Sequence, residues 1–155
     1  MSPAVSADGV VVLGSNDHFE YGIDVMTGKV RWTVPRGEET YSSATISAYG
    51  LAFYGDHTAT LYVVDTASGR ITRPTITRVD KPDRSHGIWT SSAIDAAGAA
   101  YYGTRSGHVF GVGPNGHVLF DHDLGGTLAS YPALGGDGSL YIGSSNGTII
   151  AFNPG

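Results

Sequence analysis

The chain has 155 residues, of which 41% are hydrophobic and 15% charged, so it is long and apolar enough to bury a core. Its net charge of −5 and its lack of any Lys or Arg cluster argue against nucleic-acid binding and against an anionic membrane surface. The absence of cysteine excludes a disulfide framework, a Cys-ligated zinc site and a thiol nucleophile, and no apolar run approaches the ~18 residues that a membrane span needs.

Four short apolar runs, each ending in glycine, follow one another along the chain. The glycines are Gly14, Gly55, Gly103 and Gly143, with spacings of 41, 48 and 40 residues. An alanine precedes each glycine by 10 or 11 residues, and a turn pair such as Asp8-Gly9 lies between the two. Four matches in one register indicate four copies of one structural unit.

Each copy consists of short runs rich in Val, Ile, Tyr and Phe, bounded by Gly, Asp, Asn and Ser, which is typical of β-strands. In the first copy we expect strands at 2–6, 10–15, 19–25 and 29–34. The run at 10–15 is apolar at consecutive positions, which indicates a strand buried on both faces. Four strands in about 40 residues, with the inner strands covered on both sides, predict a β-propeller blade. The rival immunoglobulin-like sandwich does not predict a four-fold repeat.

The fold class is therefore all-β, a β-propeller segment of about four four-stranded antiparallel blades. The expected blades span 2–41, 42–89, 90–130 and 131–155. The last copy ends at Asn153-Pro154-Gly155, so we expect it to lack its outer strand, and only Met1 precedes the first strand. We therefore expect a segment of a longer propeller, whose remaining blades belong to the parent chain, or, less favoured, two copies that associate into a ring.

The sharpest local motif is Gly22-Ile23-Asp24-Val25-Met26-Thr27-Gly28-Lys29-Val30-Arg31-Trp32. It resembles the tryptophan-docking motif A-x-D-x-x-T-G-K-x-x-W of the quinoprotein (PQQ-like) propeller repeats, and only Gly22 departs from that pattern. The resemblance covers essentially the whole chain at decreasing quality, because Arg73 and Phe120 stand at the tryptophan position of the second and third copies.

Four residues of this motif are expected to have a structural role. Asp24 and Thr27 flank a tight turn in which short polar side chains bond the backbone, and Gly28 takes a positive φ there. Trp32 follows on the outer strand and can wedge between adjacent blades. Burial of roughly 150–250 Å² of indole surface would stabilise that contact by up to about 4–6 kcal/mol.

The insertion at 74–88 is the one place where the repeat is elaborated. It contains Asp80, Lys81, Asp83, Arg84 and His86, and Trp89 follows it. Residues that enter the first strand of each blade should face the propeller axis, namely Tyr41, Ser42, Trp89, Thr90, Ser91 and Tyr131. From these sets we take as candidates for a ligand-binding lip over the channel Tyr41, His86, Trp89 and Tyr131. The alternative is a solvated inter-blade loop, with Trp89 packed as core and the other aromatic rings filling the channel.

Neither a metal site nor a catalytic residue is predicted. Among the six histidines only His117 and His122 approach a metal-ligand spacing, and five residues along a strand places two side chains on opposite faces. The serine pairs of the chain occupy repeated strand or turn positions and lack the context of a nucleophile elbow. The residues that would bind a cofactor are left unassigned.

The resemblance implies two functions of different classes. The favoured one is a non-catalytic module that binds a protein partner, as in the outer-membrane protein assembly scaffold lipoprotein and the sensor domains of some bacterial Ser/Thr kinases. The alternative is a segment of a quinoprotein dehydrogenase, whose catalytic residues and PQQ with calcium lie outside this chain; Asp24 and Asp65 are peripheral turn positions and do not qualify. The family implies the cell envelope or the extracellular space, and residues 1–15 do not resemble a signal peptide.

Overall fold

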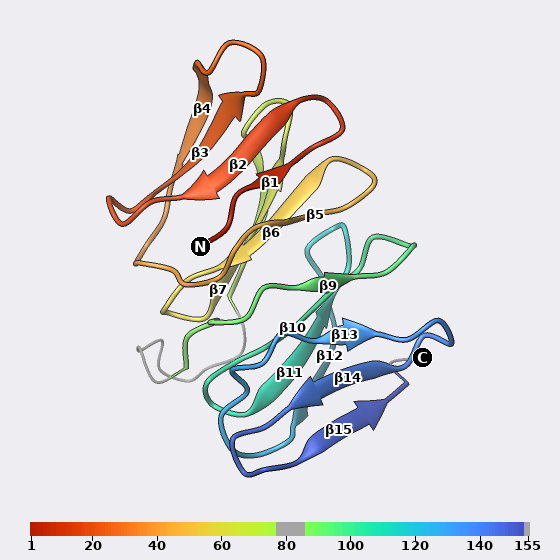
Figure 1. Ribbon diagram of the computed structural model, residues 1–155. Coiled ribbons are helices and arrows are strands. Elements are labelled where there is room, and N and C mark those ends of the chain that lie inside the picture. Colours follow the sequence, from red (N-terminus) through yellow and green to blue (C-terminus); the bar gives the residue numbers. More distant parts are fainter. Residues whose placement is uncertain (77–85, 154–155) are drawn as a thin grey trace.

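The computed structural model describes residues 1–76 and 86–153, which form fifteen strands in four antiparallel sheets (Figure 1). The first sheet contains β1 (Ala4–Val5), β2 (Val10–Gly14), β3 (Phe19–Asp24) and β4 (Val30–Pro35). The second contains β5 (Thr45–Ile46), β6 (Leu51–Gly55), β7 (Thr60–Asp65) and β8 (Ile71–Ile76). The third contains β9 (Ala93–Ile94), β10 (Ala100–Gly103), β11 (His108–Val112) and β12 (Val118–Asp123). The fourth contains β13 (Ala133–Leu134), β14 (Leu140–Gly143) and β15 (Ile149–Phe152).

Each sheet is a meander in which the strands lie in chain order. The short first strands β1, β5, β9 and β13 contact one another in sequence, so the four sheets stack side by side as blades around that common edge (Figure 1). This arrangement confirms the expected all-β propeller segment, with three strands in the last blade of the part that the structure describes. The insertion residues Asp80, Lys81, Asp83 and Arg84 lie outside the described residues.

The turn between β3 and β4 explains why its motif residues are polar. Asp24 Oδ1 accepts hydrogen bonds from Thr27 N at 2.7 Å and Thr27 Oγ1 at 2.9 Å, and Gly28 has a φ of 65°. Arg31 Nε donates to the other carboxylate oxygen at 3.0 Å. The Arg31 hydrogen bond, followed by those from Thr27, holds the pKa of Asp24 well below its usual range. The same turn recurs at Asp65, which accepts from Ser68 N at 2.8 Å.

Adjacent blades bury apolar side chains against each other, and we call each such contact a seam. We call the face of a blade that contacts the next blade in the chain its front face, and the opposite face its rear face. Each seam thus joins a front face to the rear face of the following blade. The first seam joins Val10, Val12, Trp32 and Val34 to Ala52, Tyr54, Tyr62 and Val64. The second joins Phe53, Leu61 and Val63 to Ala100, Tyr102, Phe110 and Val112. The third joins Ala99, Tyr101 and Val109 to Leu140 and Ile142. Inner strands are therefore covered on both faces, which is why β6 and β10 are apolar at consecutive positions.

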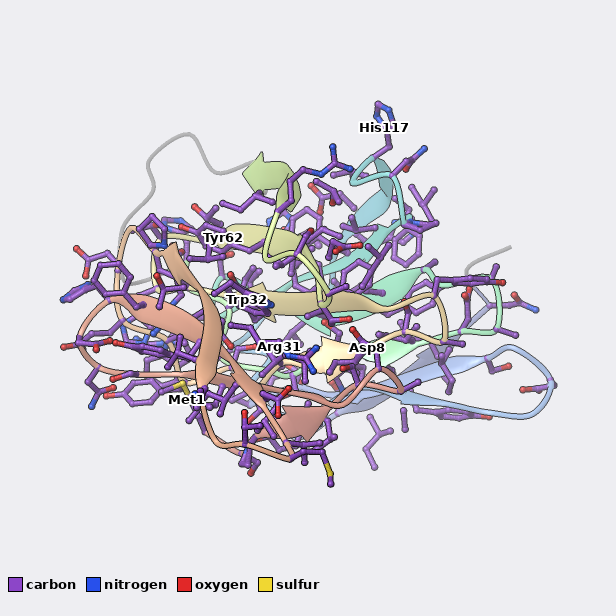
Figure 2. The ribbon with its side chains drawn as sticks, turned by 90° about the horizontal axis from the view of Figure 1, so that it is seen from above. Met1, Asp8, Arg31, Trp32, Tyr62 and His117 are labelled. Carbon is purple, nitrogen blue, oxygen red and sulfur yellow. The ribbon has the colours of Figure 1, made fainter. Side chains whose placement is uncertain are left out.

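Trp32 links the outer strand of the first blade to the second blade. Its side chain is 8% exposed, and its Nε1 donates a hydrogen bond to Thr66 O at 2.8 Å (Figure 2). The indole ring lies directly over Gly22 of its own sheet and over Gly69 of the second blade, where a Cβ would clash with it. Gly22, the one departure from the repeat motif, thus makes room for the ring.

The other two seams use different aromatic side chains. At the second seam Tyr49 packs against Gly98, and its hydroxyl donates to Ala96 O at 3.3 Å. At the third seam Phe120 lies over Gly111, as Trp32 lies over Gly22, and stacks on Tyr101 with the ring centroids 6.0 Å apart. The three seams therefore differ in the aromatic side chain that packs against the next blade or across the sheet.

The first seam also contains a buried ion pair. Glu20 pairs across the sheet with the repeat glycine Gly14, a position that Leu61 and Val109 hold in the next two blades. The Glu20 carboxylate lies 3.7 Å from Arg36 Nε, and both side chains are buried. Arg36 also donates to Ser15 O, and to Phe19 O at 3.1 Å. Burial raises the pKa of Glu20 to about 7, although the Arg36 charge opposes this.

Replacement of the docking tryptophan should destabilise the fold. We expect Trp32→Ala to lower the free energy of unfolding by about 3–5 kcal/mol, as for other buried aromatic side chains. Met26→Ala is the control, because Met26 is 88% exposed on the β3–β4 turn and should change stability by less than about 0.5 kcal/mol. Urea unfolding followed by circular dichroism measures both, and a near-neutral Trp32→Ala would show that the first seam does not depend on the ring.

The buried carboxyl group predicts a pH-dependent stability. Because the pKa of Glu20 is higher in the folded chain, at about 7 against 4.5 for an unburied carboxyl, ionisation of this group favours the unfolded chain. Its contribution to stability is complete below about pH 4.5 and is lost as the pH rises to about 7, a change of about 3 kcal/mol. Urea unfolding across this range should show a shallower fall for Glu20→Gln than for the original chain. Parallel profiles would contradict the assignment.

Candidate functional site

The segments that connect successive blades cross one end of the propeller, and we call this end the linker face. The structure describes three of these linkers: the first at 36–44, residues 86–92 of the second, and the third at 124–132. Each is hydrogen-bonded to the hairpin turn that follows the second strand of a blade. His57 N donates to Glu39 O at 3.1 Å, and Arg105 N donates to Gly87 O at 3.1 Å. The linkers are thus fixed backbone elements of this face.

A hydroxyl in each linker clamps the repeat glycine of the next blade. Thr90 Oγ1 donates to Gly103 O at 3.1 Å and accepts from Gly103 N at 3.0 Å. Ser130 makes the same two bonds to Gly143, at 3.0 and 2.7 Å. In the first linker, Ser42 Oγ accepts a hydrogen bond from Gly55 N at 3.4 Å. The sequence analysis placed Ser42 and Thr90 among the residues facing the axis; in the structure both are buried and bond the repeat glycine of the blade that they enter.

The residues directly before two of these hydroxyls form an aromatic cluster with the hairpin turns. Tyr41 lies 4.8 Å from His57 and 5.5 Å from Trp89 between ring centroids, the second pair in an edge-on geometry of 79°. The His57 and Trp89 rings are 5.7 Å apart, and Arg105 Cζ lies 4.1 Å above the Trp89 ring. We call Tyr41, His57, Trp89 and Arg105 the aromatic–arginine row. These distances suit favourable ring–ring and cation–π contacts.

One end of the row is buried, and the other end is exposed to solvent. His57 is buried, Trp89 is partly buried, and Tyr41 is 55% exposed. The indole Nε1 of Trp89 is buried and has no hydrogen-bond partner within residues 1–76 and 86–153. The arrangement offers aromatic faces and a guanidinium, which can stack on or pair with the groups of a partner.

Two of the four predicted lip residues, Tyr41 and Trp89, are brought together in the row. Tyr131 is exposed on the third linker, directly after Ser130, and no ring contact among the described residues joins it to the row. His86 is the first described residue of the second linker and is partly buried. The sequence analysis missed His57 and Arg105. Their signal was positional, because both occupy the second position after the repeat glycine of their blade.

The acidic and histidine side chains in the described part of the chain nowhere form a group of three that could hold a metal ion. His117 projects from the rim of the molecule (Figure 2), whereas the His122 ring stacks on Phe120 at 5.3 Å. Asp24 and Asp65 bond their own turns at the outer edge of the blades. These residues do not fit PQQ with calcium. No described helix is long and apolar enough to cross a membrane.

Comparison with known proteins supports the fold. No protein-family model matches the sequence, and no curated protein matches it. The structure is similar to that of BamB from Moraxella catarrhalis, with a TM-score of 0.79 and 20% identity over 99% of this chain and 49% of that one. It is also similar to the computationally designed Ika8 protein, with a TM-score of 0.81 and 18% identity over 97% of this chain and 44% of that one.

The chain is a β-propeller segment. It spans about half the length of the solved structures that it matches. At these sequence identities the similarity establishes the fold alone. A function has to be inferred from the residues of the linker face.

The two complete hydroxyl clamps, one buried and one exposed, allow the contribution of such a clamp to stability to be measured in both settings. Thr90→Val should lower the free energy of unfolding by about 2 kcal/mol, because it leaves the amide and carbonyl of Gly103 unpaired in a buried place. Ser130→Ala removes the same two bonds where water has access and should cost less than about 1 kcal/mol. Urea unfolding compares the two variants. Equal losses would mean that burial does not set the strength of the clamp.

Proposed function

We propose that the chain is a non-catalytic interaction module of the cell envelope, which binds a partner protein through its linker face. The aromatic–arginine row carries this proposal. Tyr, Trp and Arg are the residues most enriched among those that dominate protein–protein binding energies. Likeness to BamB in fold, together with the resemblance to PQQ-like repeat scaffolds, supports the same class of function and the same location.

The row is held in place before any partner arrives. His57 and Arg105 lie on tight hairpin turns whose backbone amides bond the neighbouring linkers. Tyr41 and Trp89 are each followed by a hydroxyl that binds a repeat glycine. A rigid surface of this kind loses little conformational entropy on binding, which favours affinity.

The polar groups of the linker face favour binding over catalysis. The hydroxyls that directly follow Tyr41 and Trp89 are those of Ser42 and Thr90, and each is engaged with a repeat glycine, as is Ser130 of the third linker. The quinoprotein alternative assigns its chemistry to blades outside this chain, and no step of it can be derived from the described residues.

The proposal is tested by placing a photo-crosslinking amino acid at position 41 of the full chain. After irradiation of cell-envelope extracts, we expect one crosslinked protein, identified by mass spectrometry. The same probe at position 26, an exposed site on the β3–β4 turn at the opposite end of the blade, should not capture it. Equal capture from both positions would contradict the assignment of the linker face.

Binding of the purified partner then measures the contribution of the row. We expect Tyr41→Ala and Arg105→Ala each to raise the dissociation constant by roughly tenfold or more, and Met26→Ala to leave it unchanged. Circular dichroism verifies that the variants are folded. Unchanged affinity in both row variants would overturn the proposed site.

A further inference from the structure

The outer strand of each four-stranded blade has one edge that pairs with no described strand. β4, β8 and β12 are the terminal strands of the first three sheets. In an antiparallel pair, alternate residues bond the neighbouring strand, and the residues between them direct their N–H and C=O groups away from it. The first blade has a complete blade packed on its front face, and its Thr33 and Pro35 are nonetheless exposed. The outer edge of a blade therefore stays open when the next blade is in place.

A hydrogen bond beside β12 shows which of its residues face outward. Leu124 N, directly after the strand, donates to Gly107 O at 2.9 Å. Alternate residues of β12 therefore bond β11, and Asp121 and Asp123 direct their backbone groups to the outside. Within the described part of the chain, neither of these two amides donates a backbone hydrogen bond across the edge. β12 thus offers two outward N–H groups to a further strand.

Proline occupies one outward position in each of the other two outer strands. Arg36 N, directly after β4, donates to His18 O at 2.8 Å. The outward residues of β4 are therefore Thr33 and Pro35. The register of β8 places Pro74 at the position that Thr33 has in β4. Proline has no N–H to donate, so a further strand cannot bond there, and among these three strands only β12 keeps both outward amides.

The side chains of the three edges differ in the same sense. β4 contains Arg31 and β8 contains Arg73, whereas β12 has neither Lys, Arg nor Pro. β12 begins with Val118 and Leu119, which are 44% and 57% exposed, and His117 directly before them projects from the rim of the molecule (Figure 2). Proteins commonly protect exposed edge strands with basic side chains and proline. β12 has neither form of protection.

The side chains of β12 define what a further strand must carry. Asp121 and Asp123 lie on one face of the strand, and Phe120 and His122 lie on the other. Asp121 Oδ1 is 2.7 Å from His108 Nδ1 of β11, and Asp123 is exposed. Residues of an added strand would lie directly beside these two sets. The complementary sequence therefore alternates basic residues, next to the carboxylates, with apolar residues, next to the two rings.

We propose that β12 accepts a further strand from a partner protein, an extended segment in which Lys or Arg alternates with apolar residues. Backbone hydrogen bonds to Asp121 and Asp123 give the affinity, and the two carboxylates select the basic segment. A second copy of this chain is disfavoured, because the outward residues of two antiparallel β12 strands would pair carboxylate with carboxylate. The same charges thus repel a copy and attract a basic strand. This surface shares no residue with the aromatic–arginine row.

Peptide binding to the full chain tests the proposal. The probe is an eight-residue peptide in which lysine alternates with valine, and its binding is followed by NMR spectroscopy of the backbone amides. We expect the signals of residues 118–123 to shift, and the amides of Asp121 and Asp123 to exchange with solvent more slowly because they become hydrogen-bonded. Peptides with glutamate in place of lysine, or with proline in place of the central valines, should bind more weakly by roughly tenfold or more.

Proline substitutions test the edge with changes that the fold already accommodates in sister blades. Asp121→Pro places proline where β8 has Pro74. Asp123→Pro places it where β4 has Pro35. Each variant loses one outward N–H and should raise the dissociation constant of the lysine–valine peptide by roughly tenfold or more. Thr33→Pro is the control, because it makes the same change in β4 and should leave binding unchanged. Melting curves verify that the variants are folded.

The two contributions and the two surfaces can be separated. Asp121→Asn keeps the N–H and removes only the charge, so it should weaken peptide binding less than Asp121→Pro does. Tyr41→Ala and Arg105→Ala should leave peptide binding unchanged, because the row lies on the linker face. The outcome at β12 is therefore independent of the outcome for the partner of the linker face.

Four results would overturn the proposal. Equal binding of the proline-containing peptide would mean attraction without strand pairing, and equal binding of the glutamate peptide would mean that the carboxylates select nothing. Unchanged binding in both Asp→Pro variants, or loss of binding in Tyr41→Ala, would place the peptide elsewhere. A dimer of the chain that Asp121→Pro abolishes would make a second copy the occupant of this edge.

Discussion

The face-to-face burial of apolar side chains between neighbouring sheets is the contact on which the rest of the structure depends. Each blade has apolar residues on both faces of its inner strands, as in Phe53 and Tyr54, so one sheet alone would leave half of them in water. A blade therefore buries all of these residues only between two others, and the stability of the stack is approximately a sum over its seams. Trp32, Tyr49 and Phe120 give each seam its own shape. The first seam differs further because it contains the buried pair of Glu20 and Arg36. Loss of either partner would leave the other charge buried without compensation, which destabilises the fold.

Stacking of the blades also decides where binding groups can gather. Every linker passes from the edge of one blade to the start of the next, so it lies beside the hairpin turns of two blades. Tyr41 and Trp89 belong to successive linkers, and His57 and Arg105 to successive turns. The row is consequently a product of the seams, and a change in blade packing would disperse it. The row lies on connecting segments and turns over a rigid scaffold, which is where binding residues are commonly found in proteins.

The hydroxyl clamps connect the stacking of the blades with the geometry of the linker face. The bonds from Thr90 to Gly103 fix the linker at the end of a central strand and, through the adjacent Trp89, fix the indole ring. One short side chain therefore serves both blade stacking and the geometry of the linker face. The repeat glycine Gly103 has two roles. Its backbone forms both hydrogen bonds with Thr90, and its lack of a Cβ lets Leu128 of the following linker and Ile142 of the next blade approach closely.

The sequence by itself determined the repeat, the all-β class, the strands of the first blade and the polar turn at Asp24, because these features depend on local conformation and on the period of apolar residues. It also placed Tyr41 and Trp89 at corresponding points of two linkers. Only the tertiary structure joined them to His57 and Arg105, turned Ser42 and Thr90 into buried clamps, and set Glu20 against Arg36. The first of these contacts depends on how one blade is rotated and offset against the next. The other two depend on the path of the linker and on the pairing of β3 with β4, which the period of apolar residues does not record.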